Sequence, residues 1–198
     1  MERESMIKLT GTLENLMNEL KQVHSETFYH CLRVKKLAHR MLRKTNSIGI
    51  TNYSDEEIGW ICEGTLLHDI GKLFVENALL TKDSALQTNE MENLKMHTRF
   101  GAEVVADELT GRECEFVLNL CRYHHERIDG GGYEGKTEIP LYVQIMSICD
   151  VFDALDSDRV YRKGLSREII FKMIRENKCG RFDSALIECL VDIVKDID

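Results

Sequence analysis

Apolar residues recur at every third or fourth position along most of this chain. Near its start, Leu9, Leu13, Leu16 and Leu20 fall on one face of a helix. This spacing is typical of amphipathic helices, whereas half-buried strands alternate apolar and polar residues. The chain has a single proline, Pro140, so few residues would break a helix. The pattern therefore predicts an all-α fold, a helical bundle.

The same periodicity sets the bounds of the predicted helices. Ser54 and Glu57 form a capping box, and Asn89 with Glu92 can open a later helix in the same way. The predicted helices cover residues 4–22, 25–44, 54–70, 89–110, 112–125, 140–155, the stretch after Ser166 and the stretch after Asp183 or Ser184. Residues 77–88 and 126–138 are predicted loops. We expect an N-terminal helix in residues 1–23 and one helical domain in residues 24–198.

The composition limits the classes of partner and location. Of the 198 residues, 43% are hydrophobic, which is enough for one core, and the formal net charge is −8. An acidic chain does not favour a broad nucleic-acid surface, although a small anionic ligand remains compatible if bound ions reverse the local charge. The seven cysteines include no Cys-x-x-Cys pair and are interpreted as reduced core residues of a cytoplasmic protein. We see no signal peptide and no apolar run of membrane-spanning length, so no membrane partner is expected.

Five of the seven histidines have neighbours that suit metal binding, while the other two, His24 and His39, are interpreted as ordinary residues. The candidate ligands are Glu26, His30, His68, Asp69, His97, His124, His125 and Asp150. This set of nitrogen and oxygen ligands is too large for one tetrahedral zinc ion and suits two or three hard or borderline divalent ions. Clustered ions that share ligands are used to cleave phosphate esters. The leading hypothesis is a metal-dependent phosphohydrolase.

The pair His68-Asp69 is the strongest local signal. It follows two leucines and nearly adjoins a glycine, so two ionisable groups are expected at a buried helix end. Such groups are costly to bury unless they are paired or bound to metal. A pair that only caps the helix is the alternative. Asp150 lies in an equally apolar stretch, and Asp153, on the same helical side, is expected to support it.

The other candidate ligands gain meaning from the set rather than singly. Glu26 and His30 are four residues apart and share a helical face, either as ion ligands or as a simple i,i+4 pair. His124 and His125 point about 100° apart on a helix. Each could ligate one ion, or one could face the substrate, and two surface histidines are the alternative. His97 taken alone would be an ordinary histidine.

Four cations lie close to these motifs in the sequence. Lys72 follows His68 by one helical turn and could contact a phosphate. Arg159, Arg162 and Lys163 follow the predicted helix of Asp150 and could clamp a dianionic ligand. A solvated turn is the alternative for this second group.

In their order, these motifs resemble the HD-GYP family of bacterial cyclic-dinucleotide phosphodiesterases, a branch of the HD-domain metal hydrolases. The matching segments are Leu66–Lys72, Lys95–Ala102, His124–Gly130, Gly132-Tyr133, Ile139-Pro140, Asp150–Leu155, Ser157–Arg159, Tyr161–Lys163 and Gly180–Asp183. The resemblance covers about residues 24–195. A lone His-Asp pair would be weak evidence, whereas the whole series in order is highly specific.

The resemblance implies an HD-type bundle that hydrolyses a 3′–5′ phosphodiester in a cyclic dinucleotide, with cyclic di-GMP as the expected substrate. It implies two or three divalent ions, iron or manganese, with Asp69 as the bridge between two of them. Asp69 and Lys72 are then the catalytic residues. The pair Glu26 and His30 resembles the pair that ligates a third ion in one subgroup of the family. The implied substrate contacts are Lys72, Arg159, Arg162 and Lys163.

Two segments depart from the family pattern. The namesake Gly-Tyr-Pro reads Gly132-Tyr133-Glu134, and Lys82-Asp83-Ser84 stands where the family usually carries Lys-Pro-Gly. Glu134 is expected to free the loop and to add negative charge beside an anionic substrate, so Glu134→Pro should tighten binding or raise turnover, on the order of 1 kcal/mol. Two alternatives stay open: an HD hydrolase of another nucleotide, such as cyclic GMP-AMP or a linear dinucleotide, and a non-catalytic module that binds a dinucleotide or a protein. A homodimer is also left open.

Overall fold

A computed structural model of the chain describes residues 11–82, 84–158 and 163–195. Within these ranges the backbone is helical and contains no strand beyond one isolated bridge, between Lys178 and Gly180. The helices are α1 (Gly11–Val23), α2 (Ser25–Ser47), α3 (Asp55–Leu67), the 3-10 helix η1 (Ile70–Phe74), α4 (Asn77–Leu80), α5 (Thr88–Lys95), α6 (His97–Glu108), α7 (Arg112–Tyr123), α8 (Leu141–Asp156), α9 (Arg167–Arg175) and α10 (Ser184–Lys195). The predicted all-α fold is confirmed.

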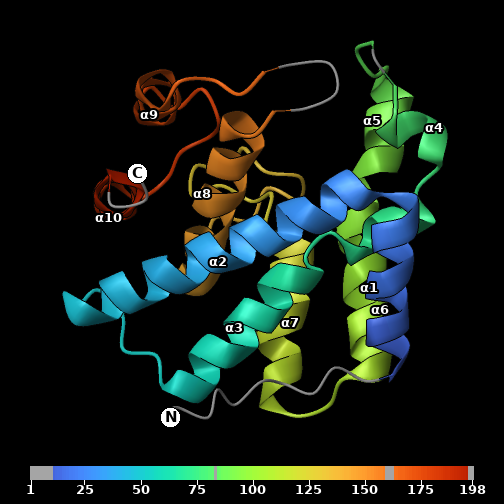
Figure 1. Cartoon of the computed structure of the whole chain (residues 1–198), viewed down its shortest axis with the longest axis horizontal. Helices are drawn as coiled ribbons and strands as arrows, with labels where there is room; N and C mark the ends of the chain where they lie inside the picture. Colours follow the sequence, from blue (N-terminus) through green and yellow to red (C-terminus); the bar gives the residue numbers. More distant parts are fainter. Residues whose placement is uncertain (1–10, 83, 159–162, 196–198) are drawn as a thin grey trace.

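The long helix α2 is the element around which the others assemble. It crosses the molecule and packs against α1, α3, α8 and α10 (Figure 1). Its apolar positions recur at helical spacing, so one side is buried along its whole length, for example at Val34 and Met41. Because α2 contacts both halves of the bundle, residues on it can meet side chains from distant parts of the sequence.

Two hydrophobic clusters hold the bundle together. The larger one lies where α2, α3, α8, α9 and α10 meet, and the smaller one joins α1 to η1, α6 and α7. In the smaller cluster Leu13 and Leu20 of α1 are fully buried, and burial of such a side chain contributes roughly 1.5–3 kcal/mol. The sequence-predicted stripe of the first helix is therefore the face that docks α1 onto the bundle.

Some predicted boundaries were wrong. Residues 77–88 are not all loop, because Asn77–Leu80 forms one helical turn. The next helix begins earlier than predicted, since Glu90 rather than Glu92 accepts the hydrogen bond that caps it, from the Gln87 N–H at 2.7 Å. That helix also ends at Lys95, and α6 begins separately at His97. Residues 4–10 of the first predicted helix lie outside the described residues.

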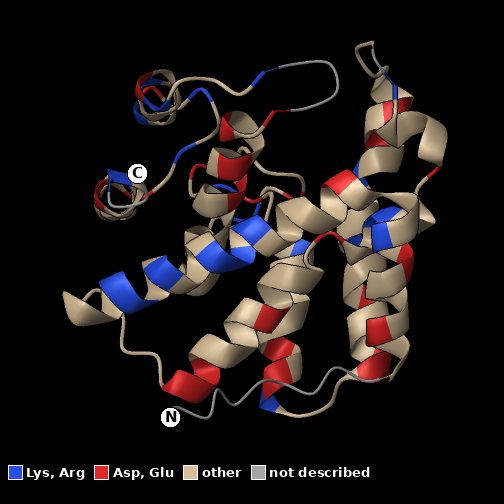
Figure 2. Cartoon of the chain, viewed as in Figure 1, with Lys and Arg blue, Asp and Glu red and all other residues tan. Residues whose placement is uncertain are grey.

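Charge is unevenly spread over the surface. The solvent-facing side of α2 carries a row of cations, including Arg33, Lys36, Arg40 and Arg43, in a chain whose net charge is −8 (Figure 2). Acidic side chains mark most of the other helices (Figure 2). Among the helices described, none is both long and apolar enough to cross a membrane.

Candidate metal centre

Three histidines sit at helix ends and share one hydrogen-bond pattern. His68 follows α3, His97 begins α6 and His124 follows α7. In each ring Nδ1 lies within hydrogen-bond distance of the carbonyl oxygen three residues earlier: 2.7 Å for Thr65, 2.6 Å for Leu94 and 2.9 Å for Cys121. A proton on Nδ1 that is donated to a carbonyl leaves Nε2 as the free ligand atom. This outer hydrogen bond is typical of histidines that ligate metals.

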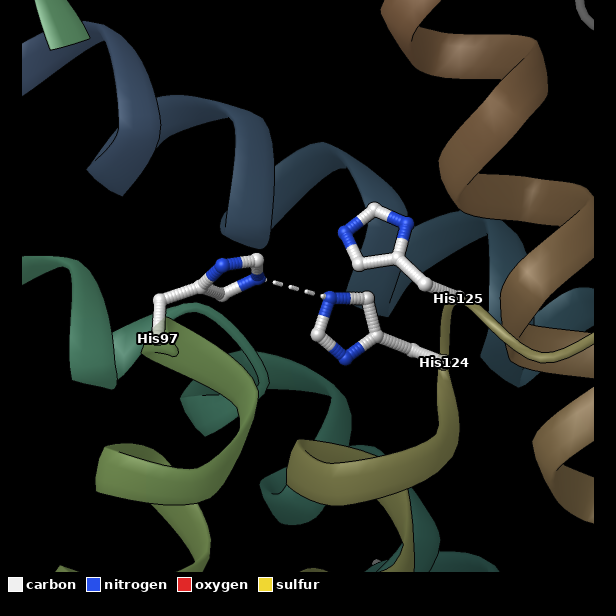
Figure 3. A group of neighbouring side chains, drawn as sticks. All are labelled: His97, His124 and His125. Atoms are coloured by element: carbon white, nitrogen blue, oxygen red, sulfur yellow. Dashed lines mark hydrogen bonds between the residues drawn. The ribbon is translucent and has the colours of Figure 1, made fainter. Parts of the chain in front are cut away.

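His97, His124 and His125 form the first cluster. Their ligand atoms lie within 4.8 Å of one another, and one nitrogen of the His97 ring is directed at one nitrogen of the His124 ring (Figure 3). Their Nε2 atoms are 3.3 Å apart. With both Nδ1 protons donated to the backbone, two Nε2 lone pairs point at each other, and a bound cation would relieve that repulsion.

His30, His68 and Asp150 form the second cluster, again with ligand atoms within 4.8 Å. His30 Nε2 lies 2.9 Å from Asp150 Oδ1, and its Nδ1 lies 2.7 Å from Asp153 Oδ2. Arg33 donates two hydrogen bonds to the same Asp153 carboxylate. Asp153 therefore orients His30 from behind and leaves Nε2 directed at Asp150, in line with the supporting role expected from the sequence.

Asp69 lies between the two clusters. Its Oδ1 is 3.4 Å from His97 Nε2 and 3.8 Å from His124 Nε2, while its Oδ2 is 3.4 Å from His68 Nε2. The Lys72 ammonium donates a hydrogen bond to Oδ2 at 2.5 Å. Both Asp69 Oδ1 and His68 Nε2 are buried without a hydrogen-bond partner. Buried polar atoms without partners are costly, so these atoms fit a site completed by a cation.

The protonation states differ between the clusters. Burial lowers the pKa of His97 to about 4 and, together with the His97 ring, that of His125 to about 3, while burial also holds the pKa of His124 well below 6.5. These imidazoles are neutral at neutral pH, as metal ligands must be. In the second cluster burial also lowers the pKa of His30, but its hydrogen bonds to Asp150 and Asp153 outweigh this and raise it to about 9. A metal ion at His30 would replace that proton.

The carboxylates of the site are ionised. Burial favours the neutral acid of Asp69, but Lys72, His68 and His97 outweigh burial and hold the pKa of Asp69 well below its usual range. Burial likewise favours the neutral acid of Asp150, but the hydrogen bond and charge of His30 and the charge of His68 outweigh it and lower the pKa of Asp150. Negative charge is therefore present between imidazoles, where a divalent cation would bind.

The structure brings together most of the predicted site, but not all of it. His30, His68, Asp69, His97, His124, His125 and Asp150 converge from α2, the α3–η1 junction, α6, the end of α7 and α8. Glu26 is exposed and belongs to none of the clusters found among the described residues, so its predicted role with a third ion stays a prediction. Lys163 is exposed beyond the end of α8, and Arg159 and Arg162 lie outside the described residues.

Three residues at the site had no assigned role in the sequence analysis. Cys31, interpreted there as a core residue, is fully buried with a ligand atom within 4.8 Å of those of His68 and Asp69. Tyr133 stacks on the ring of His125 with 4.3 Å between centroids. Glu126 is 2% exposed and accepts two backbone hydrogen bonds from the following loop. Cys31 adjoins His30 in the sequence, which was the available signal. Tyr133 and Glu126 lie in segments that match the family motifs, but no local pattern predicts their contacts with His125 and with the loop backbone.

Comparison with known families matches the HD domain to residues 27–155 of this chain. The chain belongs to the HD-domain family. The match begins just after Glu26 and ends at Leu155, so it contains both histidine–aspartate clusters described above.

Similar proteins are phosphodiesterases of cyclic dinucleotides. The chain is 37% identical over 133 residues to a cyclic di-GMP phosphodiesterase of Pseudomonas aeruginosa, covering 65% of the chain and 31% of that relative. It is 28% identical to a 3′3′-cGAMP-specific phosphodiesterase of Vibrio cholerae, covering 90% of the chain and 33% of the relative. It is also 28% identical to the cyclic di-GMP phosphodiesterase response regulator RpfG of Xanthomonas campestris, covering 96% and 53%. The chain thus spans between about a third and about half the length of these relatives.

Solved structures share the fold. An HDG"Y"P protein from Bdellovibrio bacteriovorus superposes with a TM-score of 0.66 at 20% identity, over 93% of this chain and 60% of that one. The HD domain of the L. monocytogenes phosphodiesterase PgpH in complex with cyclic-di-AMP gives 0.60 at 16% identity, over 92% and 97%. At these identities the likeness concerns the HD fold alone.

Proposed function

We propose that this chain is a metal-dependent phosphodiesterase that hydrolyses a cyclic dinucleotide, with cyclic di-GMP as its first substrate. The observation that carries the proposal is the convergence of five histidines and two aspartates, from separate helices, on one buried place. Within this group Asp69 Oδ1 and His68 Nε2 are buried without hydrogen-bond partners, and burial of such atoms costs free energy. Metal binding would repay that cost.

The contacts support two ions per chain. The first would be held by His97, His124 and His125, and the second by His30, His68 and Asp150. Asp69 would serve both, since Oδ1 is directed at the first cluster and Oδ2 at the second. Nitrogen and oxygen ligands of this kind suit iron or manganese.

The protein's own groups have distinct tasks in this proposal. Bound divalent ions would supply Lewis acidity for attack on a phosphodiester. Asp153 orients the His30 ring, and the carbonyls of Thr65, Leu94 and Cys121 fix the other rings. Lys72, hydrogen-bonded to Asp69 at 2.5 Å, lies where its charge would offset that developing on phosphoryl oxygens. Lys163, with Arg159 and Arg162, would contact the second phosphate.

A mixed GMP-AMP ring is the second candidate substrate. The relative that covers 90% of this chain is specific for 3′3′-cGAMP, whereas the relatives that cover 65% and 96% act on cyclic di-GMP. All these rings share the bridging phosphodiesters that the metal centre would bind, so the base contacts distinguish them.

The test is metal content and product formation on anaerobically purified protein. We expect about two transition-metal equivalents per chain and hydrolysis of cyclic di-GMP. Chromatography of the products measures this hydrolysis, with cyclic GMP-AMP and cyclic-di-AMP offered as alternative substrates. Asp69→Asn should lose metal and reduce turnover at least about 100-fold, because it removes the shared charge. Asp192→Asn, on the exposed face of α10, is the matched control.

Two outcomes would contradict the proposal. If the folded wild-type chain contains no metal, the two clusters are not a metal centre. A metal-loaded chain that binds these rings but hydrolyses none of them would make it a non-catalytic binding module.

A further inference from the structure

The side chain of Glu134 is not a free charge at the tip of its loop. Its Oε1 lies 3.4 Å from Arg99 Nε and 3.2 Å from Arg122 Nε, and its Oε2 lies 3.3 Å from Arg122 Nη2. Arg122 thus grips the carboxylate with two nitrogens, a geometry that favours one fixed orientation. The arginines come from α6 and α7, the two helices whose ends carry His97 and His124.

The backbone around Glu134 is fixed as well. Its N–H donates to Glu126 Oε1 at 2.8 Å, and the Lys136 N–H donates to Glu126 Oε2 at 2.7 Å. Glu126 itself is buried, with 2% exposure. A side chain at Gly132 would come within 2.5 Å of the Glu126 backbone, so only glycine allows the loop to lie this close. The expectation that Glu134 frees the loop is therefore wrong for this chain.

The residue that this arrangement holds in place is Tyr133. Its ring stacks on His125 at 4.3 Å with 28° between the planes, and meets the His97 ring edge-on at 6.3 Å. The Lys95 ammonium lies 5.4 Å from the Tyr133 ring centre. Within the described part of the chain, the His125 ring makes no hydrogen bond to a backbone carbonyl of the kind that orients His68, His97 and His124. The stacked Tyr133 ring is therefore the contact that restrains the orientation of the His125 ring from the loop side.

We propose that Glu134 is a positioning residue: its ion pairs with Arg99 and Arg122 hold Tyr133 against His125, and the stacked ring fixes that imidazole as a metal ligand. This inference rests on the proposed function, because His125 acts as a ligand only if the first cluster binds metal. In this chain the Glu134 carboxylate would restrain the loop, in the position where the family pattern has a proline.

The first measurement uses metal-free protein and the NMR signals of the His125 ring, which respond to the ring current of Tyr133. In Glu134→Gln and Arg122→Gln these signals should move toward those of Tyr133→Ala. Tyr133→Phe should keep them near wild type, because it keeps the stack and removes only the hydroxyl. The matched control is Glu188→Gln, which breaks a comparable exposed pair with Arg175, at 2.9 Å and 3.2 Å, on α9 and α10.

The second measurement is the affinity for Mn²⁺ by competition with a chelator. We expect Glu134→Gln and Arg122→Gln each to weaken one metal equivalent about threefold to tenfold, as befits partly exposed ion pairs, and the double variant to add little. Glu188→Gln should leave both equivalents unchanged.

The outcomes separate the two proposals. Unmoved His125 signals in Glu134→Gln overturn the positioning role, and so do moved signals with an unchanged Mn²⁺ affinity. Absence of metal from the wild type overturns the proposed function. The ring signals of the metal-free variants still decide whether the ion pairs of Glu134 with Arg99 and Arg122 orient His125.

Discussion

Among single residues, His30 is the candidate ligand with a partner at each ring nitrogen. Both ring nitrogens are engaged, one with Asp153 and one with Asp150. Glu26, one helical turn earlier, is exposed. The two residues predicted to share a third ion therefore have different surroundings, and the structure places His30 in the second cluster.

This difference gives a prediction for the metal count. His30→Gln should lower the count by about one equivalent, because it removes a ligand that Asp153 holds in place. Glu26→Gln should leave the count unchanged, with His39→Gln as a control outside the site. Metal analysis of the purified variants checks this. An equal loss in Glu26→Gln and His30→Gln would instead support a third ion shared by the two residues.

Glu134→Pro gives a second prediction at this scale, opposite to the one drawn from the sequence. Proline lacks the N–H that donates to buried Glu126 and the carboxylate that meets the two arginines. Loss of a hydrogen bond to a charged group costs roughly 1.5–3 kcal/mol, so stability and metal affinity should both fall. Urea unfolding and metal titration measure this, with Glu134→Gln as the variant that keeps the N–H. A gain in turnover would restore the original expectation.

At the scale of elements, the site is built from helix ends. His68 and His124 follow α3 and α7, and His97 opens α6. The carbonyl oxygens that accept the Nδ1 protons lie in the last turns of α3, α5 and α7, where helical carbonyls lack intrahelical partners. The backbone carbonyls left without helical partners thus orient the three imidazole rings.

The contact between η1 and α6 leads to a prediction for Gly71. A Cβ at this position would lie 1.9 Å from the His97 carbonyl oxygen and 2.6 Å from the Gly101 nitrogen, both of them backbone atoms. Gly71→Ala should therefore push α6 away from η1, cost at least about 1–3 kcal/mol and loosen His97 from the first cluster. Chemical denaturation and metal titration should both detect it.

Gly11→Ala is the control for this variant. It lies in α1 with no atom within 4 Å of an added Cβ, so it should be close to neutral. Wild-type stability and metal content in Gly71→Ala would show that the contact between η1 and α6 can accommodate a Cβ.

At the scale of the whole molecule, buried titratable groups couple stability to pH. In metal-free protein His97, His124 and His125 have lowered pKa values, so the unfolded chain binds more protons below about pH 6.5. Stability must then fall as the pH drops from 6.5 toward 4. His30, with its pKa raised to about 9, acts in the opposite direction: its contribution is complete below 6.5 and is lost as the pH rises to 9. His68 acts in the same direction as His30, because burial lowers its pKa but Cys31 and Asp69 outweigh burial and raise that pKa well above 6.5.

We therefore predict that the metal-free protein is most stable near pH 6.5. Each affected histidine changes the free energy of unfolding by up to about 1.4 kcal/mol per pH unit. Urea unfolding after chelation, at intervals from pH 4.5 to 9, measures the curve. His97→Gln should flatten its acid side, and a curve that is flat from 5 to 6.5 in the wild type would contradict the assigned burial of these rings.

The sequence by itself determined the helical class and singled out most of the histidines and aspartates that the fold brings together. Apolar spacing predicts helices because a 3.6-residue repeat places those residues on one face, and the capping box at Ser54 and Glu57 is present as predicted. The candidate ligands were recognisable because ionisable groups in apolar stretches are costly to bury unless they are paired or bound to metal.

Only the tertiary structure decided how those ligands are divided and how the loop is held. Asp69 faces both clusters because η1, α6 and α7 pack together, and no local pattern encodes that contact. Glu134 meets Arg99 and Arg122, 35 and 12 residues away in the sequence. Such pairs depend on helix packing, which periodicity does not specify. For this reason the sequence indicated a free charge at Glu134, whereas in the fold this carboxylate forms ion pairs with two arginines.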